Sequence, residues 1–297
     1  MNADMIKLLK LLLPIALIAL SSCVRDEVPQ CPDLKVTVEV KDKNYANIDD
    51  VEMLERVPED LPFRSYVPTL YYILCDAESG EVVEQDGVFD VEGDEKNYTI
   101  NFCSCLPHGH YTLTIWGGLD DNSPVDGDGN PHTLDFHPGN AEGLDVYVAM
   151  LDIVYDADNY EYTAQMERTK GKLLIECSGY EPGFVSSEKS IDHLRAKVDH
   201  SLAYDGRTHV VSNHFIDTPV APMMTATALS PSTSADASIL HLQLGDGNKT
   251  FNPHDVKICI HRNELTVLRY IYNPDAHSFK VLVLVNAAWK ELVELEI

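Results

Sequence analysis

Residues 34–40 read Leu34-Lys35-Val36-Thr37-Val38-Glu39-Val40, with an apolar side chain at every second position. Successive side chains of an extended strand point to opposite faces, so this stretch predicts a half-buried β-strand. The same alternation recurs at 111–115, 240–244 and 256–260. Further strand-like runs occupy residues 70–75, 98–103, 144–150, 160–167, 171–177, 266–272 and 279–285. Turn-forming clusters such as 120–130 and 245–248 separate them, which indicates an all-β protein.

Evidence for helices is thin. Residues 48–56 fit a short helix or an irregular crossover, and residues 190–200 fit a helix or a strand, of which we favour the strand because strands surround it. Many short strands with regular turns indicate β-sandwiches. A polar, basic stretch at 168–171 separates two strand series, so we predict one sandwich over 31–167 and a second over 168–297.

The N-terminus carries the features of a bacterial lipoprotein signal peptide. Lys7 and Lys10 make the start of the chain basic. The apolar run 8–20, which contains Lys10, is followed by Ser21-Ser22-Cys23. The run is too short for a spanning helix, which needs about 20 apolar residues. We predict a signal peptide over 1–22, cleavage between Ser22 and Cys23, and lipid on Cys23. The alternatives are an ordinary cleaved signal and an uncleaved N-terminal anchor.

Residues 23–30 are predicted to form a lipidated tether to the outer membrane. Stable anchoring needs more than one acyl chain, and bacterial lipoproteins carry several on one cysteine. The tether begins Val24-Arg25-Asp26-Glu27, which resembles the export tag that sends some lipoproteins to the cell surface. The alternative is a solvated charged linker.

Composition excludes one class of partner. The chain has 48 acidic and 22 basic residues and a net charge of −26. This charge repels phosphate backbones, so nucleic-acid binding is excluded, and it disfavours docking to anionic lipid headgroups.

Six of the seven cysteines remain after Cys23 is set aside. Cys177 and Cys259 lie in apolar runs and are predicted to be plain buried thiols. Cys31 is the best candidate for a disulfide, with Cys103 or Cys105 as its partner, and the spacing does not choose between them.

Two stretches resemble metal sites, but the first has the wrong spacing and the second has the wrong residues at two required positions. Cys103, Cys105, His108 and His110 do not follow a common zinc pattern, and a β-turn is the better interpretation. Residues 126–130 begin like a calcium loop, but Pro131 stands where Gly is required and His137 where Glu is required. An acidic, Gly-rich surface loop is the better interpretation, with a looser calcium site that includes Asp120 or Asp121 as the alternative.

The sequence carries no motif for a catalytic nucleophile, a metalloprotease, a phosphate loop or a dinucleotide site. We therefore predict no enzymatic activity, no metal and no cofactor. The aromatic residues in strand-like runs are expected in the core, with a sugar-binding platform as the alternative; they are Tyr71, Tyr72, Tyr111, Trp116 and Trp289.

One stretch resembles a known family. Residues 106–118 read Leu-Pro-His-Gly-His-Tyr-Thr-Leu-Thr-Ile-Trp-Gly-Gly, which is similar to a turn and strand in the anchor subunits of type V fimbriae. The opening Cys and strand at 31–36, the stretch 166–173 and the closing strand 281–285 with Trp289 resemble the same family, in the same order.

The resemblance implies two tandem transthyretin-like β-sandwiches without enzymatic activity. It implies partners among fimbrial shaft or accessory subunits, which join when an extended strand of one subunit completes an open groove in the next. An anchor of this kind holds the fimbria at the outer membrane and limits its length. We expect the C-terminal segment 279–297 to meet the neighbouring subunit.

The chain departs from the shaft subunits of the class, which are cleaved at an Arg near the first strand. Arg56 and Arg64 lie after the first strand, so we interpret residues 44–67 as a surface loop and predict no processing. The first alternative function is a surface glycan-binding lipoprotein of a nutrient-uptake system, which predicts an exposed cluster of Trp or Tyr. The second is a hydrolase with two carboxyls about 5–9.5 Å apart.

Overall fold

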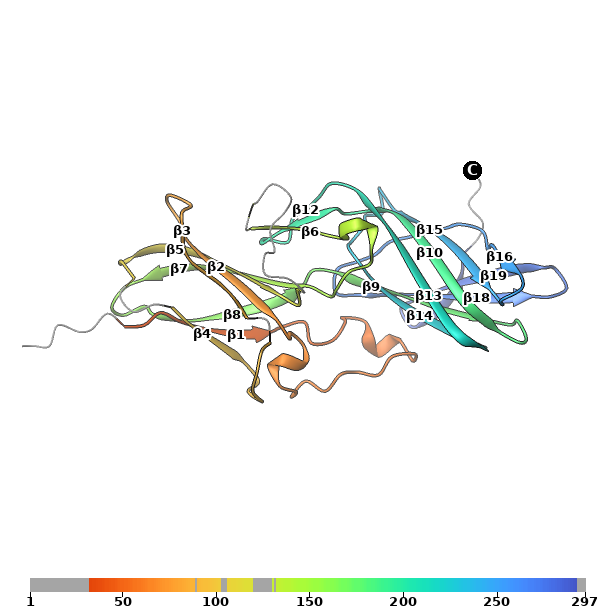
Figure 1. Ribbon diagram of the computed structural model, residues 1–297, viewed down its shortest axis with the longest axis horizontal. Helices are drawn as coiled ribbons and strands as arrows, with labels where there is room; N and C mark the ends of the chain where they lie inside the picture. Colours follow the sequence, from red (N-terminus) through yellow and green to blue (C-terminus); the bar gives the residue numbers. More distant parts are fainter. Residues whose placement is uncertain (1–31, 89, 103–105, 120–129, 131, 293–297) are drawn as a thin grey trace, which may run out of the picture.

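The computed structural model describes residues 32–88, 90–102, 106–119, 130 and 132–292, and within them it confirms the all-β prediction. The described residues contain three 3-10 helices and no α-helix; the former are η2 (Ile48–Asp50), η3 (Phe63–Ser65) and η4 (Pro138–Asn140). Two β-sandwiches follow one another along the long axis of the molecule (Figure 1), as the predicted tandem arrangement requires.

The strands of the first half are β1 (Lys35–Val40), β2 (Leu70–Asp76), β3 (Val82–Val88), β4 (Tyr98–Asn101), β5 (Gly109–Gly117), β6 (Thr133–Asp135), β7 (Tyr147–Tyr155) and β8 (Glu161–Arg168). Seven of them follow the order β3-β2-β5-β7-β8-β1-β4. The path bends at β7–β8, where the ladder has only the pairs Tyr147↔Arg168 and Val148↔Glu167. The strands on the two sides of this bend form the two layers.

The alternating stretch 34–40 points its apolar residues into the core of the first sandwich. Val36 and Val38 are fully buried there, together with side chains from β2, β5 and β8. β1 runs parallel to β8 and antiparallel to β4. The period-two pattern therefore gives the strand its buried face directly.

The strands of the second half are β9 (Gly171–Ser178), β10 (Phe184–Leu194), β11 (Lys197–Asp199), β12 (Tyr204–Asp205), β13 (Thr208–Val220), β14 (Met223–Leu229), β15 (Ser238–Gly245), β16 (Thr250–Phe251), β17 (Val256–Ile258), β18 (Leu265–Asn273), β19 (Ser278–Val285) and β20 (Ala288–Glu291). One layer has the order β14-β9-β18-β19-β20. The other has the order β13-β10-β15-β16, and β17 also pairs with β15. Their inner faces share one hydrophobic core.

The stretch 106–118 owes its composition to close packing. The Tyr111 hydroxyl donates a hydrogen bond to the Pro107 carbonyl at 2.6 Å, which closes the turn before β5. A Cβ on Gly117 would lie 2.5 Å from Val67 Cγ1, and Gly118 has a φ of +79° with its Cβ position 2.4 Å from the Asp145 carbonyl. Only glycine fits both positions.

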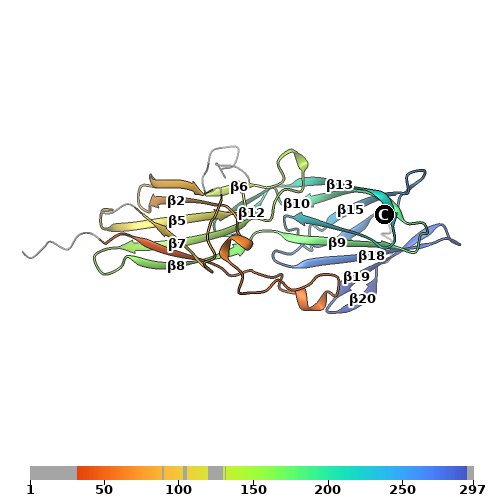
Figure 2. The same cartoon turned by 60° about the horizontal axis from the view of Figure 1, so that its bottom comes forward.

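Each half of the chain covers an outer face of the other. The small sheet β12-β11-β6 places Val198 and Tyr204 over Trp116 and Ile73, on the face of β2 and β5 that points away from the first core. The connection between β1 and β2 reaches the second sandwich near β19 and β20 (Figure 2). This exchange ties the two sandwiches together at their junction.

The interpretation of residues 44–67 as a surface loop is therefore wrong for its first part. Tyr45, Ile48 and Val51 are buried against Leu174 and Val267 on the outer face of β9 and β18. A connection that covers an apolar sheet face removes that area from water, which explains its apolar residues. The arginines of this segment are exposed and form ion pairs, Arg56 with Asp49 and Glu59, and Arg64 with Asp94.

A buried polar network fills the junction. The Arg168 side chain is only 6% exposed; it donates to Asp145 Oδ2 at 2.8 Å and to Asn263 Oδ1 at 2.7 Å, and it also donates to the Tyr147 hydroxyl. Its guanidinium carbon lies 4.1 Å from the ring centroid of Tyr45. A buried guanidinium needs such partners, because an unpaired charge there would be costly.

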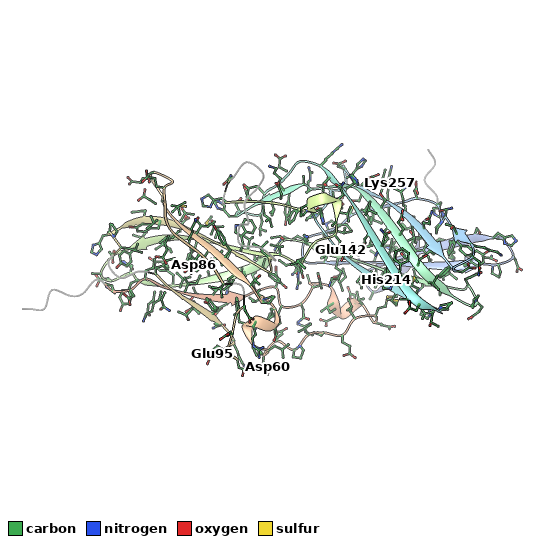
Figure 3. The ribbon with its side chains drawn as sticks, viewed as in Figure 1. Asp60, Asp86, Glu95, Glu142, His214 and Lys257 are labelled. Atoms are coloured by element: carbon green, nitrogen blue, oxygen red, sulfur yellow. The ribbon has the colours of Figure 1, made fainter. Side chains whose placement is uncertain are left out.

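Glu142 connects the two halves at the same junction (Figure 3). Its carboxylate accepts a hydrogen bond from the Ser212 hydroxyl at 2.7 Å, and its carbonyl accepts one from Lys170 Nζ at 3.1 Å. Burial lowers the pKa of Lys170 to about 8. The charged groups of this network therefore influence one another's pKa values.

His137 makes the stability of the junction depend on pH. The Ser230 amide donates to His137 Nε2 at 3.0 Å, and His137 Nδ1 donates to the Ala141 carbonyl at 2.9 Å, so the buried ring is neutral. Burial and then the charge of Lys170 lower its pKa from 6.5 to about 3. The unfolded chain binds this proton below about pH 6.5 and the folded chain does not, so stability falls as pH drops from about 6.5 to about 3.

We expect wild type to lose about 2–3 kcal/mol more than His137→Asn between pH 6.5 and 4.5. Asparagine does not titrate, and it tolerates the positive φ of 54° at this position. Urea denaturation at the two pH values measures the difference. An identical loss in both proteins would mean that His137 is not the group responsible.

Candidate functional site

A groove with both polar and apolar side chains in its lining opens on one side of the second sandwich, between its two layers. It is lined by the end of β17, the start of β18, the end of β19 and Leu292, and its volume is about 390 Å³. The wall residues from these strands are Ile258, Cys259, Leu265, Thr266, Val283, Leu284 and Val285. The other lining residues are polar, so half of the lining is polar; they are Asn47, Asp50, Lys257, His261, Glu264 and Asn286.

The groove exists because the start of β18 does not pair with the end of β19. Their ladder begins at Leu268↔Val283, whereas Leu265 at the start of β18 pairs only with β9. Leu284 and Val285 pair instead with β20. No described strand pairs with the start of β18 on this side, and the Asn47 side chain takes that place: its Oδ1 accepts from the Leu265 amide at 2.8 Å and its Nδ2 donates to the Leu265 carbonyl at 2.9 Å.

β17 borders the same opening with a free edge. It pairs with β15 on one side, and no ladder is recorded on its other side in the described part of the chain. Free strand edges carry unpaired N–H and C=O groups that can pair with an added strand. The half-buried Val283, Leu284 and Val285 offer an apolar surface for alternate side chains of that strand. The arrangement is suited to receiving an extended peptide.

The C-terminal segment 279–297 divides into parts with different roles. β19 lies between β18 and β20, so it cannot leave the sheet without breaking two ladders. β20 is the edge strand, and its Trp289 lies under the Arg269 guanidinium, 4.2 Å from ring centroid to Cζ. Residues 293–297 lie outside the described residues. Within this segment, β20 and the end of β19 are therefore the parts available for contact with another chain.

Most of the site residues predicted from sequence cannot be placed. Ser22, Cys23, Cys31, Cys103 and Cys105 all lie outside the described residues, as do residues 126–129 of the calcium-like stretch.

The cysteines that the structure describes are free; they are Cys75, Cys177 and Cys259. Cys177 is buried, as predicted, and burial raises its pKa to about 12, which makes it an inert thiol. Cys259 is only partly buried and lines the groove. Its exposure departs from the prediction because β17 ends just before it and its strand edge is open.

The remaining candidates behave as structural residues. His108 packs its ring against Tyr155, with centroids 5.8 Å apart. Among the described residues, no three His, Cys, Asp or Glu side chains gather as a metal site would require. The aromatic side chains predicted in the core are buried at four positions, namely Tyr71, Tyr72, Tyr111 and Trp116. Trp289 is partly buried.

No helix in the described part of the chain has both the length and the apolar character needed to span a bilayer.

Comparison with solved structures shows the same fold in proteins of very different sequence. A candidate adhesin of Bacteroides thetaiotaomicron matches with a TM-score of 0.59 and 14% identity, over 89% of this chain and 99% of that one. A candidate adhesin of Bacteroides ovatus matches with a TM-score of 0.57 and 12% identity, over 92% and 98%. A fimbrial assembly protein of Parabacteroides distasonis matches with a TM-score of 0.51 and 11% identity, over 85% and 95%.

No protein-family profile matches this chain, and no curated protein does. At these identities the likeness establishes the fold, and it covers nearly the full length of each matched structure. The fold is thus shared with proteins described as candidate adhesins and as a fimbrial assembly protein.

Proposed function

We propose that this chain is a non-enzymatic fimbrial subunit of the outer cell surface that anchors a fimbria and limits its length. Lipid on Cys23 holds it to the outer membrane, and the two sandwiches, 31–167 and 168–297, form the body of the anchor. A neighbouring shaft or accessory subunit supplies an extended strand that enters the groove of the second sandwich.

The groove between β17, β18 and β19 carries this proposal. It combines the free edge of β17 and the incompletely paired end of β19 with apolar side chains on one wall, and strand addition uses main-chain pairing for affinity and side-chain pockets for specificity. The shared fold with candidate adhesins and a fimbrial assembly protein supports the same class of function.

The position of the groove suits an anchor. The described chain begins at the end of the first sandwich that lies away from the second (Figure 1). The Tyr155 hydroxyl donates to the Pro32 carbonyl at 2.6 Å and fixes this entry point. A lipid attached before it leaves the second sandwich, with its groove, on the side away from the membrane.

Replacing Cys23 with alanine is expected to release fibres into the culture medium, because it removes the proposed site of lipid attachment. Electron microscopy of cells and of the collected medium measures the distribution. Ser22→Ala is the matched control, since it keeps a small residue before the cysteine. Fibres that remain on Cys23→Ala cells in wild-type number and length would overturn the anchor role.

A further inference from the structure

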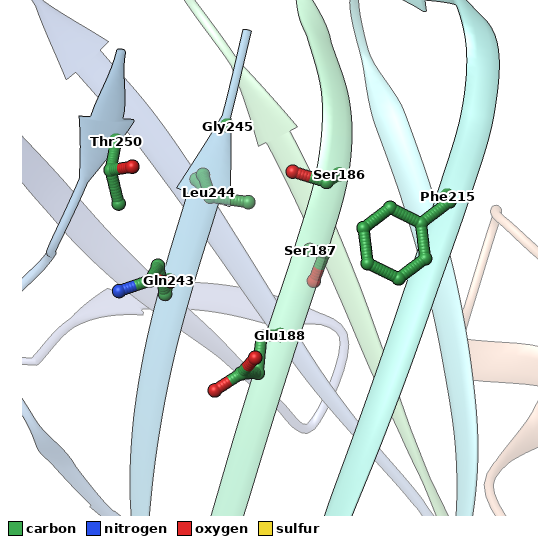
Figure 4. A pocket seen from close by; sticks show the side chains of 8 residues that line it. All are labelled: Ser186, Ser187, Glu188, Phe215, Gln243, Leu244, Gly245 and Thr250. Atoms are coloured by element: carbon green, nitrogen blue, oxygen red, sulfur yellow. The ribbon is translucent and has the colours of Figure 1, made fainter. Parts of the chain in front are cut away.

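The outer face of the layer β13-β10-β15-β16 carries a second site, on the side opposite the core of the second sandwich. The strand registers place Phe215, Ser186, Gly245 and Thr250 in one row across the four strands (Figure 4). The ring of Phe215 stands beside the two smallest members of the row. The row therefore has an aromatic side chain at one end and a low floor next to it.

Two adjoining hollows lie on this face of the sheet, the first at the row and the second further along the strands. The first is about 110 Å³ and lies among Phe215, Ser186 and Gly245. A Cβ on Gly245 would stand 2.4 Å from Ser186 Oγ, so any larger residue there would disturb the floor. The second is about 200 Å³, shares Glu188 and Gln243 with the first, and continues along the same face. Together they form a shallow trough on a sheet surface.

Phe215 is 74% exposed, more than any other large apolar side chain in the described part of the chain. Single exposed apolar residues are common, but this one borders a hollow and has polar neighbours across the strands. Phe215 lies two residues after Asn213 on β13, and Asn213 pairs with Glu188 on β10. An isolated ring within a polar face suits a ligand that has both an apolar face and hydroxyl groups.

The polar side chains of the trough are planar and already oriented. Gln243 Nε2 donates to Asn252 Oδ1 at 3.0 Å, which leaves an acceptor oxygen on Gln243 and a donor nitrogen on Asn252. His241 lies between Asp255, at 2.8 Å, and Asp192, at 3.3 Å. Amides and carboxylates of this kind form paired hydrogen bonds with vicinal hydroxyls.

The charge of the face decides the ligand class. Glu188 and Asp255 line the trough and the whole chain carries a net charge of −26, which repels sialylated or uronate glycans. The other residues that line the hollow beside Phe215 are mostly polar or small. We propose that this trough binds a neutral oligosaccharide, with Phe215 stacked on one sugar ring and Gln243 and Glu188 bonded to its hydroxyls.

The test uses the full mature chain in detergent micelles and an array of neutral gluco-, galacto- and mannohexaoses, with sialylated hexasaccharides beside them. We expect wild type to bind at least one neutral probe and Phe215→Ala to weaken that binding about tenfold or more, equivalent to about 1.4 kcal/mol. Gln243→Ala should weaken it as well. Met224→Ala is the control, because Met224 is an exposed apolar residue on the opposite layer.

Three binding results would overturn the proposal. They are the absence of binding to every neutral probe, binding to sialylated probes alone, and equal binding by Phe215→Ala and wild type. The proposal is also overturned if wild type forms a dimer that Phe215→Ala does not form, since the ring would then belong to a protein interface. This inference goes beyond the anchoring role, and it can fail while fibres remain attached to the cell.

Discussion

Arg168→Ala is expected to lower the free energy of unfolding by about 3–5 kcal/mol, because it removes one partner of a buried charged network. The guanidinium bonds to Asp145, Asn263 and a tyrosine hydroxyl, so its loss leaves several polar groups without their partner in a closed junction. It also removes the cation that lies on the ring of Tyr45. Urea denaturation of the mature chain measures the change.

Arg207→Ala is the matched control. The Arg207 side chain is 64% exposed and pairs with Asp236 at 2.8 Å, and an exposed pair of this kind contributes at most about 1 kcal/mol. A loss in Arg168→Ala no larger than in Arg207→Ala would contradict the role of Arg168 as the centre of the junction. Arg168→Lys should fall between the two, because lysine keeps the charge but cannot form the same fork of hydrogen bonds.

The strands that the sequence predicts are those whose alternating apolar side chains are buried in a core. Leu240 and Leu244 on β15, like Val36 and Val38 on β1, are fully buried. The sequence does not predict β3, β13 or β14, which are all edge strands of their sheets. β3 exposes side chains on both faces, so its residues follow no strict period, and on β14 two of the alternating buried positions are threonines, Thr225 and Thr227, which hides the apolar period. Most residues of β3 are exposed, which explains why it was missed.

The contacts between the two halves could not be predicted from sequence for a different reason. Tyr45, Ile48 and Val51 are apolar, but the sheet face that they cover is formed by residues more than a hundred positions later. The same holds for the groove, which depends on where the β18–β19 ladder begins, and for the Phe215 trough, which depends on the registers of four strands. A local pattern contains no information on such pairings.

Val285→Lys is expected to reduce the number of cell-bound fibres about tenfold or more, because it places a charge in the apolar wall that an incoming strand would cover. Val285 is half-buried at the end of β19, next to the turn that leads to β20, so the lysine can reach solvent in the free chain. The isolated protein should therefore keep its stability within about 1 kcal/mol. The effect is expected on subunit joining and not on folding.

The most direct measurement is a count of attached fibres by electron microscopy on cells that carry Val285→Lys or Val82→Lys, with equal surface amounts of the two proteins. Val82→Lys introduces the same charge at an exposed valine on β3, at an edge of the first sandwich and outside the groove. We expect few attached fibres with Val285→Lys and a wild-type number with Val82→Lys. Equal numbers on both would mean that the groove does not join this chain to a fimbria.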